Sequence, residues 1–212
     1  MLFDRQTPLR EQQMHPIFIS GLEALGMTAE KIPSLDVINE KLMSMTGWQG
    51  VAVEGLEEGI DFFEMLADKK FPIGNFIREQ KDLSYTPAPD IFHDLYGHIP
   101  FYTDVRYADF CYRYGQKVLQ NANNPTVLRE YERFFWFTAE FALIQTAKGR
   151  RIFGAGIASS FGECAYALSD KPMVKPFSIA EIRNQEFRID IIQEKLFELH
   201  SEEQLYNSLE IL

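Results

Sequence analysis

The chain has 212 residues, 46% of them hydrophobic and 25% charged, which is enough to bury the core of one domain. Its 31 acidic and 21 basic side chains give a net charge of −10, which excludes the basic surface that binds nucleic acid or an anionic membrane. Two cysteines are too few for a disulfide framework, and no apolar run reaches the length of a signal peptide or a membrane span, so we expect a cytoplasmic protein.

Helical spacing of apolar residues dominates the chain, while strand signals are few and short. The predicted helices span residues 9–13, 17–25, 34–43, 58–67, 105–120, 126–148, 160–168, 179–183 and 201–212. Candidate strands are 51–53 and 187–192, both short and rich in β-branched residues. The fold class is therefore mainly α with a few short β-strands (α+β). We expect a single domain over 1–212, with a helical part (1–46), a core (47–201) and a terminal helix (202–212).

The segment from Pro89 to Pro100 holds two of the four histidines. Residues five apart lie about 140° apart around an α-helix, so His93 and His98 would not share a face of a straight one. We therefore expect the helix that starts near Asp90 to end at a left-handed Gly97. The chain leaving that helix would then bring the second imidazole back toward the first.

Glu140 lies in the strongly apolar run 134–144, with aromatic or aliphatic neighbours three and four residues away on both sides. A buried, unpaired carboxylate is costly, so this side chain must protonate, form an ion pair or bind a metal. An ion pair with Arg129, Arg133 or Arg150 is one alternative. Two imidazoles and one carboxylate around a metal leave coordination positions open, as in non-haem Fe(II) oxygenases.

Five sequence blocks, in this order and spacing, resemble one known family. The blocks are Phe76–Arg78, Tyr85–Pro100, Phe135–Phe141, Phe153–Glu163 and Phe187–Asp190. The family is that of the tetrahydropterin-dependent aromatic amino acid hydroxylases, of the bacterial phenylalanine 4-hydroxylase type. The resemblance covers roughly residues 47–201 and implies that the domain is a catalytic domain of this type.

The resemblance also assigns roles to individual residues. It implies that the Fe(II) ligands and catalytic centre are His93, His98 and Glu140. It implies substrate contacts from Arg78, Thr86, Pro87, Trp136, Phe141 and Ser159. Among these, Arg78 would bind the amino acid carboxylate, and Ser159 would also orient His93 by a hydrogen bond. The tetrahydropterin (tetrahydrobiopterin or a related form) would contact Phe62, Gly55 and Leu56.

The implied activity is a monooxygenase that hydroxylates an aromatic L-amino acid with dioxygen. Trp136 and the apolar Ile189 favour phenylalanine as substrate and tyrosine as product, with tryptophan hydroxylation as a second possibility within the family. Two proteins of different classes would also fit the same residues. One is a zinc hydrolase that uses the same ligands with Asp94 or Glu163 as base. The second is a non-catalytic pterin or amino acid sensor, suggested by the acidic segment 54–58. A monomer is expected, although the sequence also allows a dimer.

Overall fold

The computed structural model describes residues 2–6, 10–55, 57, 59–80 and 89–212. Its α-helices are α1 (Leu2–Gln6), α2 (Arg10–Gln13), α3 (Pro16–Leu25), α4 (Leu35–Met45), α5 (Gly59–Ala67), α6 (Val105–Asn121), α7 (Pro125–Phe135), α8 (Ala155–Ala158), α9 (Phe161–Ala167), α10 (Ile179–Asn184) and α11 (Glu202–Tyr206). Shorter helical turns of other types are η3 (His93–His98), η4 (Ile99–Thr103), η5 (Trp136–Glu140) and η6 (Asn207–Glu210). The strands are β1 (Gln49–Ala52), β2 (Lys70–Ile73), β3 (Ala142–Thr146), β4 (Gly149–Ile152), β5 (Met173–Pro176) and β6 (Lys195–Leu199). Helix dominates, as the sequence predicts.

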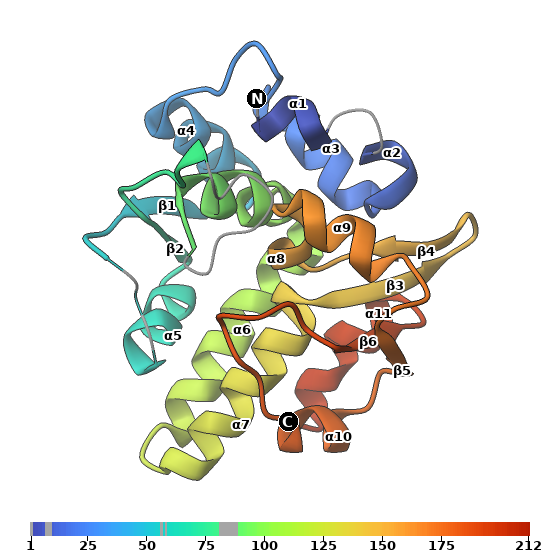
Figure 1. Ribbon diagram of the computed structural model, residues 1–212. Coiled ribbons are helices and arrows are strands. Elements are labelled where there is room, and N and C mark those ends of the chain that lie inside the picture. The colour runs from blue at the N-terminus through green and yellow to red at the C-terminus, as the bar shows by residue number, and fades with distance from the viewer. Residues whose placement is uncertain (1, 7–9, 56, 58, 81–88) are drawn as a thin grey trace.

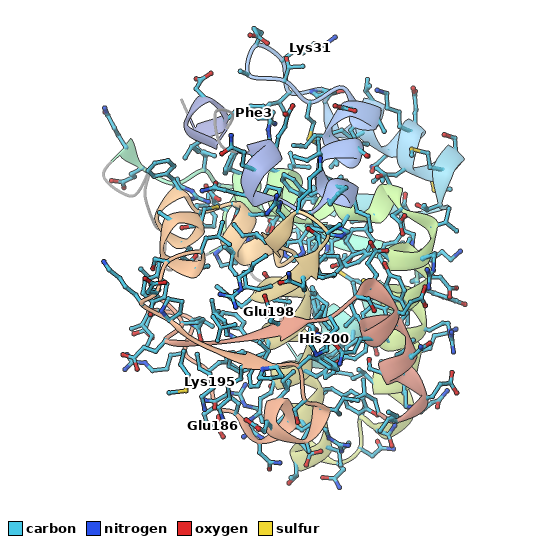
Figure 2. All side chains as sticks on the ribbon, turned by 90° about the vertical axis from the view of Figure 1, so that its right-hand side faces the viewer. Phe3, Lys31, Glu186, Lys195, Glu198 and His200 are labelled. Atoms are coloured by element: carbon cyan, nitrogen blue, oxygen red, sulfur yellow. The ribbon has the colours of Figure 1, made fainter. Side chains whose placement is uncertain are left out.

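The strands form two small sheets. In the larger sheet the order is β4-β3-β6-β5, with β3 antiparallel to β4 and parallel to β6. The other sheet is the parallel pair β1-β2. Figure 1 shows the long helices α6 and α7 running side by side below the larger sheet, with the N-terminal helices at the opposite end. In Figure 2, Lys195 and Glu198 lie along β6, and His200 follows its end.

Caps in the sequence explain where the long helices begin. The Asp104 side chain accepts hydrogen bonds from two backbone amides at the start of α6, at 3.0 and 2.9 Å. Asn124 does the same for α7, where Pro125 occupies the first helical position. Ser160 caps α9 through the Glu163 amide at 3.3 Å, so the capping predicted there is present. Among the described residues, no helix combines the length and the apolar character that a membrane span needs.

Two sequence predictions of secondary structure are wrong. The helix predicted over 126–148 ends after Glu140, and residues 142–146 form β3 instead. Its apolar run fits either structure, and pairing with β4 and β6 decides for the strand. Residues 187–192, predicted as a strand, carry no strand pairing. The strand predicted at 51–53 corresponds to β1, whereas β2 to β6 were not predicted.

The core between these elements is largely aromatic. Fully buried rings of Phe63 on α5, Tyr114 on α6 and Phe134 on α7 join the three helices below the sheet. Tyr114 packs against Phe134 with ring centroids 5.7 Å apart and against Phe63 at 6.0 Å. The many aromatic residues therefore serve mainly as core, and the helices that they join form one side of the cavity described below.

His15 connects the two ends of the chain. Its Nδ1 accepts a hydrogen bond from the Ile17 amide at 3.4 Å, and its Nε2 lies 3.2 Å from a Glu202 oxygen at the start of α11. The side chain is 5% exposed, and burial lowers its pKa to about 4, although the charge of Asp104 opposes the shift. The native protein therefore holds a neutral His15 at a pH where the unfolded chain protonates it.

This difference predicts a pH-dependent contribution to stability. With the native pKa below the unfolded value of 6.5, the contribution is complete above pH 6.5 and is lost as the pH falls toward 4. Lowering the pH from 7 to 4.5 should reduce the free energy of unfolding of both proteins. The reduction should be smaller for His15→Gln than for the unsubstituted protein, by roughly 2–3 kcal/mol. Urea unfolding in the presence of a chelator measures this. His200→Gln, at an exposed position, is the control. Parallel pH curves for all three proteins would refute the prediction.

Candidate metal and substrate site

His93 and His98 share one face because the helix between them is a π-helix. A π-helix is closed by amides that bond five residues back, and at the end of η3 the Ile99 amide donates to the Asp94 carbonyl in this way. Residues five apart therefore lie about one turn apart, on the same side. The predicted left-handed end at Gly97 is wrong, because its φ is not positive and the chain continues into η4. Gly97 is needed for space: a Cβ there would lie 2.7 Å from the Ala155 carbonyl oxygen.

Glu140 also ends a π-helical turn. Helix α7 widens into η5, and the Phe141 amide donates to the Trp136 carbonyl at 3.0 Å. The chain returning after β4 passes directly against this turn, since a Cβ on Gly154 would lie 2.2 Å from the Glu140 carbonyl oxygen. The backbone of Glu140 is thus enclosed by β3 on one side and by the segment leading to α8 on the other. Such local π-helices inside α-helices are frequent at functional sites.

The three predicted ligand residues meet at one point. His98 Nε2 lies 2.9 Å from Glu140 Oε1 and 3.1 Å from His93 Nε2, and His93 Nε2 lies 3.7 Å from Glu140 Oε2. Metal bonds of about 2.1 Å that meet at right angles hold their donor atoms about 3 Å apart. The donor set therefore fits a single transition-metal ion bound on one side.

The alternative prediction, that Glu140 forms an ion pair with one of three arginines, is wrong for the described residues. The arginines proposed for it bond elsewhere: Arg129 to Glu132, Arg133 to Glu186, and Arg150 to Glu198. The partners of the Glu140 carboxylate are the two imidazoles and the Gly156 backbone amide. Burial alone would raise the pKa of Glu140, but the charge and hydrogen bond of His98 lower it below its usual value. The acid is therefore ionised, as a metal ligand must be.

Ser159 sets the proton position on His93. The Ser159 hydroxyl donates its hydrogen to the Gly156 carbonyl at 3.2 Å. The hydroxyl oxygen must therefore accept the hydrogen bond from His93 Nδ1–H at 2.9 Å. The Nε2 lone pair of His93 then points toward His98 and Glu140. Burial lowers the pKa of His93 to about 4, with the charge of Glu140 opposing, so this imidazole is neutral and able to bind a metal.

A cavity of about 840 Å³ opens at this cluster. The predicted site residues that line it are Gly55, Phe62, Arg78, His93, His98, Trp136, Glu140, Phe141 and Ser159. The remaining three predictions, Leu56, Thr86 and Pro87, lie outside the described residues. A cavity of this size suits a ligand of tens of atoms, or two smaller molecules together.

Arg78 is held rigidly by Asp90, a residue that the sequence analysis did not assign. Arg78 Nε and Nη2 donate to the two Asp90 oxygens at 2.9 and 2.7 Å, and Arg78 Nη1 donates to the Ser159 carbonyl at 3.3 Å. Asp90 also accepts from the backbone amides of Arg78 and His93, both at 2.9 Å. Burial would raise the pKa of Asp90, but the hydrogen bonds from Arg78 and His93 lower it. The position of Asp90, one residue after a proline at a helix start, is the sequence signal of such a cap.

Two further buried acids line the cavity. Asp94 accepts a hydrogen bond from the Gly74 amide at 2.7 Å, and burial raises its pKa to about 7. Glu163 is 6% exposed, and burial raises its pKa to about 7 as well. The sequence suggested both only as the base of a hydrolase. Their burial beside the cavity could not be read from residue spacing, because it depends on how distant elements pack.

An aromatic column forms another wall. The ring of Phe187 stacks on Trp136 at 4.4 Å and 13°, and Trp136 lies 4.7 Å from Phe141. The Arg129 guanidinium covers the outer face of Phe187 at 4.4 Å. The irregular segment that contains Phe187 therefore supports Trp136 from outside, which the strand prediction for 187–192 did not anticipate.

The Arg78–Asp90 pair predicts a large loss of stability on its disruption. Asp90→Asn should lower the free energy of unfolding by about 3–5 kcal/mol, because it leaves a buried guanidinium without its counter-charge. Thermal unfolding measures this. Asp190→Asn is the matched control: it removes the acid from another Arg–Asp pair, with Arg188, which is exposed. It should leave the midpoint unchanged. Equal midpoints for the two variants would contradict the role of Asp90.

Comparisons with known proteins agree with this geometry. The profile of the biopterin-dependent aromatic amino acid hydroxylases matches residues 11–210. A phenylalanine-4-hydroxylase of Ralstonia nicotianae is 42% identical over 208 residues, which are 98% of this chain and 66% of that protein. One of Pseudomonas aeruginosa is 38% identical over 205 residues, covering 97% of this chain and 78% of that protein. The chain thus spans about two thirds to three quarters of these relatives.

Solved structures agree as well. The phenylalanine hydroxylase of Chromobacterium violaceum, solved with bound iron(III) and 7,8-dihydrobiopterin, has a TM-score of 0.92 and 40% identity, covering 98% of this chain and 76% of that one. The enzyme of Legionella pneumophila has the same TM-score at 41% identity, covering 98% of this chain and 89% of that one.

The chain therefore belongs to the biopterin-dependent aromatic amino acid hydroxylase family. The predicted family, fold class and cofactor class, iron with a biopterin, are confirmed. A zinc hydrolase and a non-catalytic sensor find no support in these comparisons.

Proposed function

We propose that this chain is an Fe(II)- and tetrahydropterin-dependent monooxygenase that converts L-phenylalanine to L-tyrosine with dioxygen. The main support is the convergence of His93, His98 and Glu140 beside a cavity that also holds a fixed guanidinium and aromatic walls. The names of the bacterial relatives favour phenylalanine over tryptophan. Trp136 and Ile189 favour the same substrate, as argued from the sequence.

In this proposal His93 Nε2, His98 Nε2 and one Glu140 oxygen bind Fe(II). Three protein ligands would leave coordination positions open on one side of the ion. Together with the reduced pterin, iron bound here would activate dioxygen and supply the oxygen atom that is inserted into the substrate ring. Ser159 fixes the tautomer and the ring orientation of His93, as hydrogen-bond partners of metal ligands generally do.

The protein would position the amino acid substrate at both ends. Arg78 would bind the carboxylate with the N–H groups that Asp90 and Ser159 leave free, since a guanidinium offers five. Trp136 and Phe141 would enclose the ring, with Phe187 holding Trp136 in place. Thr86 and Pro87 would complete the substrate contacts, as the family resemblance implies. Fixing both ends determines which ring carbon faces the metal.

The pterin would bind on the other side of the cavity. Phe62 is half-buried at the cavity wall, with edge contacts to Phe71 and Phe135 that hold its ring in place for stacking. Gly55 also lines the cavity, and the family resemblance adds Leu56. The remaining proposals are a monomer, a single catalytic domain over 1–212 and a cytoplasmic location. The last is favoured by the free, buried Cys111 and Cys164.

The proposal predicts the product and the source of its new oxygen. Protein loaded with Fe(II) and given tetrahydrobiopterin, ¹⁸O₂ and an equal mixture of phenylalanine and tryptophan should yield mainly ¹⁸O-labelled tyrosine by mass spectrometry. Glu140→Gln should lower the rate at least about 100-fold, because it removes a charged ligand. Mainly hydroxytryptophan would refute the substrate assignment. Tightly held zinc with hydrolytic activity and no pterin dependence would refute the reaction.

The role of Ser159 predicts a defined loss of metal affinity. Ser159→Ala removes the acceptor for His93 Nδ1–H and should weaken Fe(II) or Co(II) binding about 10- to 100-fold. The contact of Arg78 with the Ser159 carbonyl is a backbone contact and is retained. Ser169→Ala is the control, because it removes only local hydrogen bonds, one to the Tyr166 carbonyl and one from the Lys171 amide. Competition with a metal indicator measures both. Unchanged affinity in Ser159→Ala would contradict the role.

A further inference from the structure

Glu163 is a buried acid at the cavity that the reaction proposed above does not use. It lies in the first turn of α9, is 6% exposed, and lines the same cavity as Arg78, Ser159 and Ser160. A carboxylate in such a place is costly unless something stabilises its charge. Burial raises its pKa to about 7, while a hydrogen bond from Ser160 and the charge of Arg78 oppose the shift.

Glu163 stands on the side of the cavity where Arg78 is fixed. Arg78 Nη1 donates to the Ser159 carbonyl, and Ser160 caps the turn that contains Glu163 through an amide contact of 3.3 Å. A single short segment, 159–163, therefore carries both the anchor of the guanidinium and the acid. Arg78 is also one of the charges that act on Glu163.

Most of the other described acids at or beside the cavity have defined partners, and Glu57, which also lines it, is only half-buried. Asp90 accepts four hydrogen bonds from Arg78 and His93 and is fully buried. Asp94 accepts from the Gly74 amide, at the end of β2. Glu132 pairs with Arg129, and Asp190 pairs with Arg188. Of this group, Glu163 is the buried acid that combines a position near Arg78 with lone pairs left over after the Ser160 bond.

An amino acid brings two opposite charges on neighbouring atoms into this cavity. Its carboxylate and its ammonium are both bound to Cα, so their protein partners must also be neighbours. An ammonium moved out of water without an acceptor is strongly disfavoured. A cavity that offers only a guanidinium would bind a carboxylate but would leave the ammonium unpaired.

We propose that the Glu163 carboxylate accepts the α-ammonium group of the amino acid substrate while Arg78 binds its carboxylate. The inference rests on the proposed function, since it assigns one end of that substrate. The two contacts, from Glu163 and from Arg78, would make the site selective for free amino acids. Aromatic acids that lack the ammonium group would leave a buried carboxylate unpaired, and N-acylated amino acids would present no cation to it.

The test compares two ligands that differ by one group, L-phenylalanine and 3-phenylpropanoate. Calorimetric titrations use the iron-loaded protein, kept anaerobic and free of pterin so that no turnover occurs. Glu163→Gln should weaken phenylalanine binding roughly 10- to 100-fold, because a charged hydrogen bond is replaced by a neutral one. Binding of 3-phenylpropanoate should not weaken and should instead tighten, since this ligand makes no contact that the substitution removes and the substitution abolishes the unpaired buried carboxylate. Glu181→Gln, at an acid outside the cavity whose partner is Lys175, is the control and should affect neither ligand.

The outcomes separate this inference from the proposed function. If Glu163→Gln weakened the binding of both ligands equally, Glu163 would have a structural role. If it weakened the binding of neither, Glu163 would not contact the ammonium group. Either result would overturn the inference. Glu163→Asp, which keeps the charge, should recover part of the phenylalanine affinity. Absence of phenylalanine binding by the unsubstituted protein would overturn the proposed function as well. Normal hydroxylation of phenylalanine together with an ineffective Glu163→Gln would overturn the inference alone.

Discussion

The carboxylate of Asp90 is the contact on which the geometry of the site depends. It accepts hydrogen bonds from the Arg78 guanidinium, the Arg78 amide and the His93 amide. One buried acid thereby fixes a loop residue and the first turn of the helix that contains the histidines. Since both charges are removed from water, each is stable only in the presence of the other. Together with Ser159, which contacts both Arg78 and His93, this one side chain determines the distance between the guanidinium and the metal-binding cluster.

The two π-helical turns solve a spacing problem. His93 and His98 are five residues apart, an interval that an α-helix would turn to different faces and that a π-helix brings to one face. The turn that ends at Glu140 is of the same type and follows a regular α-helix. Both turns are poorly packed in isolation and need close neighbours. The segment from Gly154 to Ser159 provides them, since it passes close to both Gly97 and Glu140.

The sequence sufficed to predict the residues of the site better than their geometry. His93 and His98 were proposed from their spacing in a segment with a glycine and prolines, and Glu140 from its apolar surroundings; the family resemblance then implied that the three bind one metal. The left-handed end at Gly97 was wrong because α-helical geometry was assumed between the histidines. The helix over 126–148 was wrong because β3 owes its conformation to β6, more than 50 residues later in the chain. The sequence did not predict that Asp90 and Glu163 are buried beside the cavity, since the burial of a lone acid depends on contacts between distant elements.

The parallel pairing of β3 with β6 has a consequence for biosynthesis. Glu140 stands immediately before β3, and the partner residues of β3 are Phe197, Glu198 and Leu199. A nascent chain on the ribosome contains both histidines and the acid long before this last strand emerges from the exit tunnel. The β3–β6 pairing beside the carboxylate therefore forms only after residues 195–199 have been synthesised, because a non-local strand pair cannot form earlier.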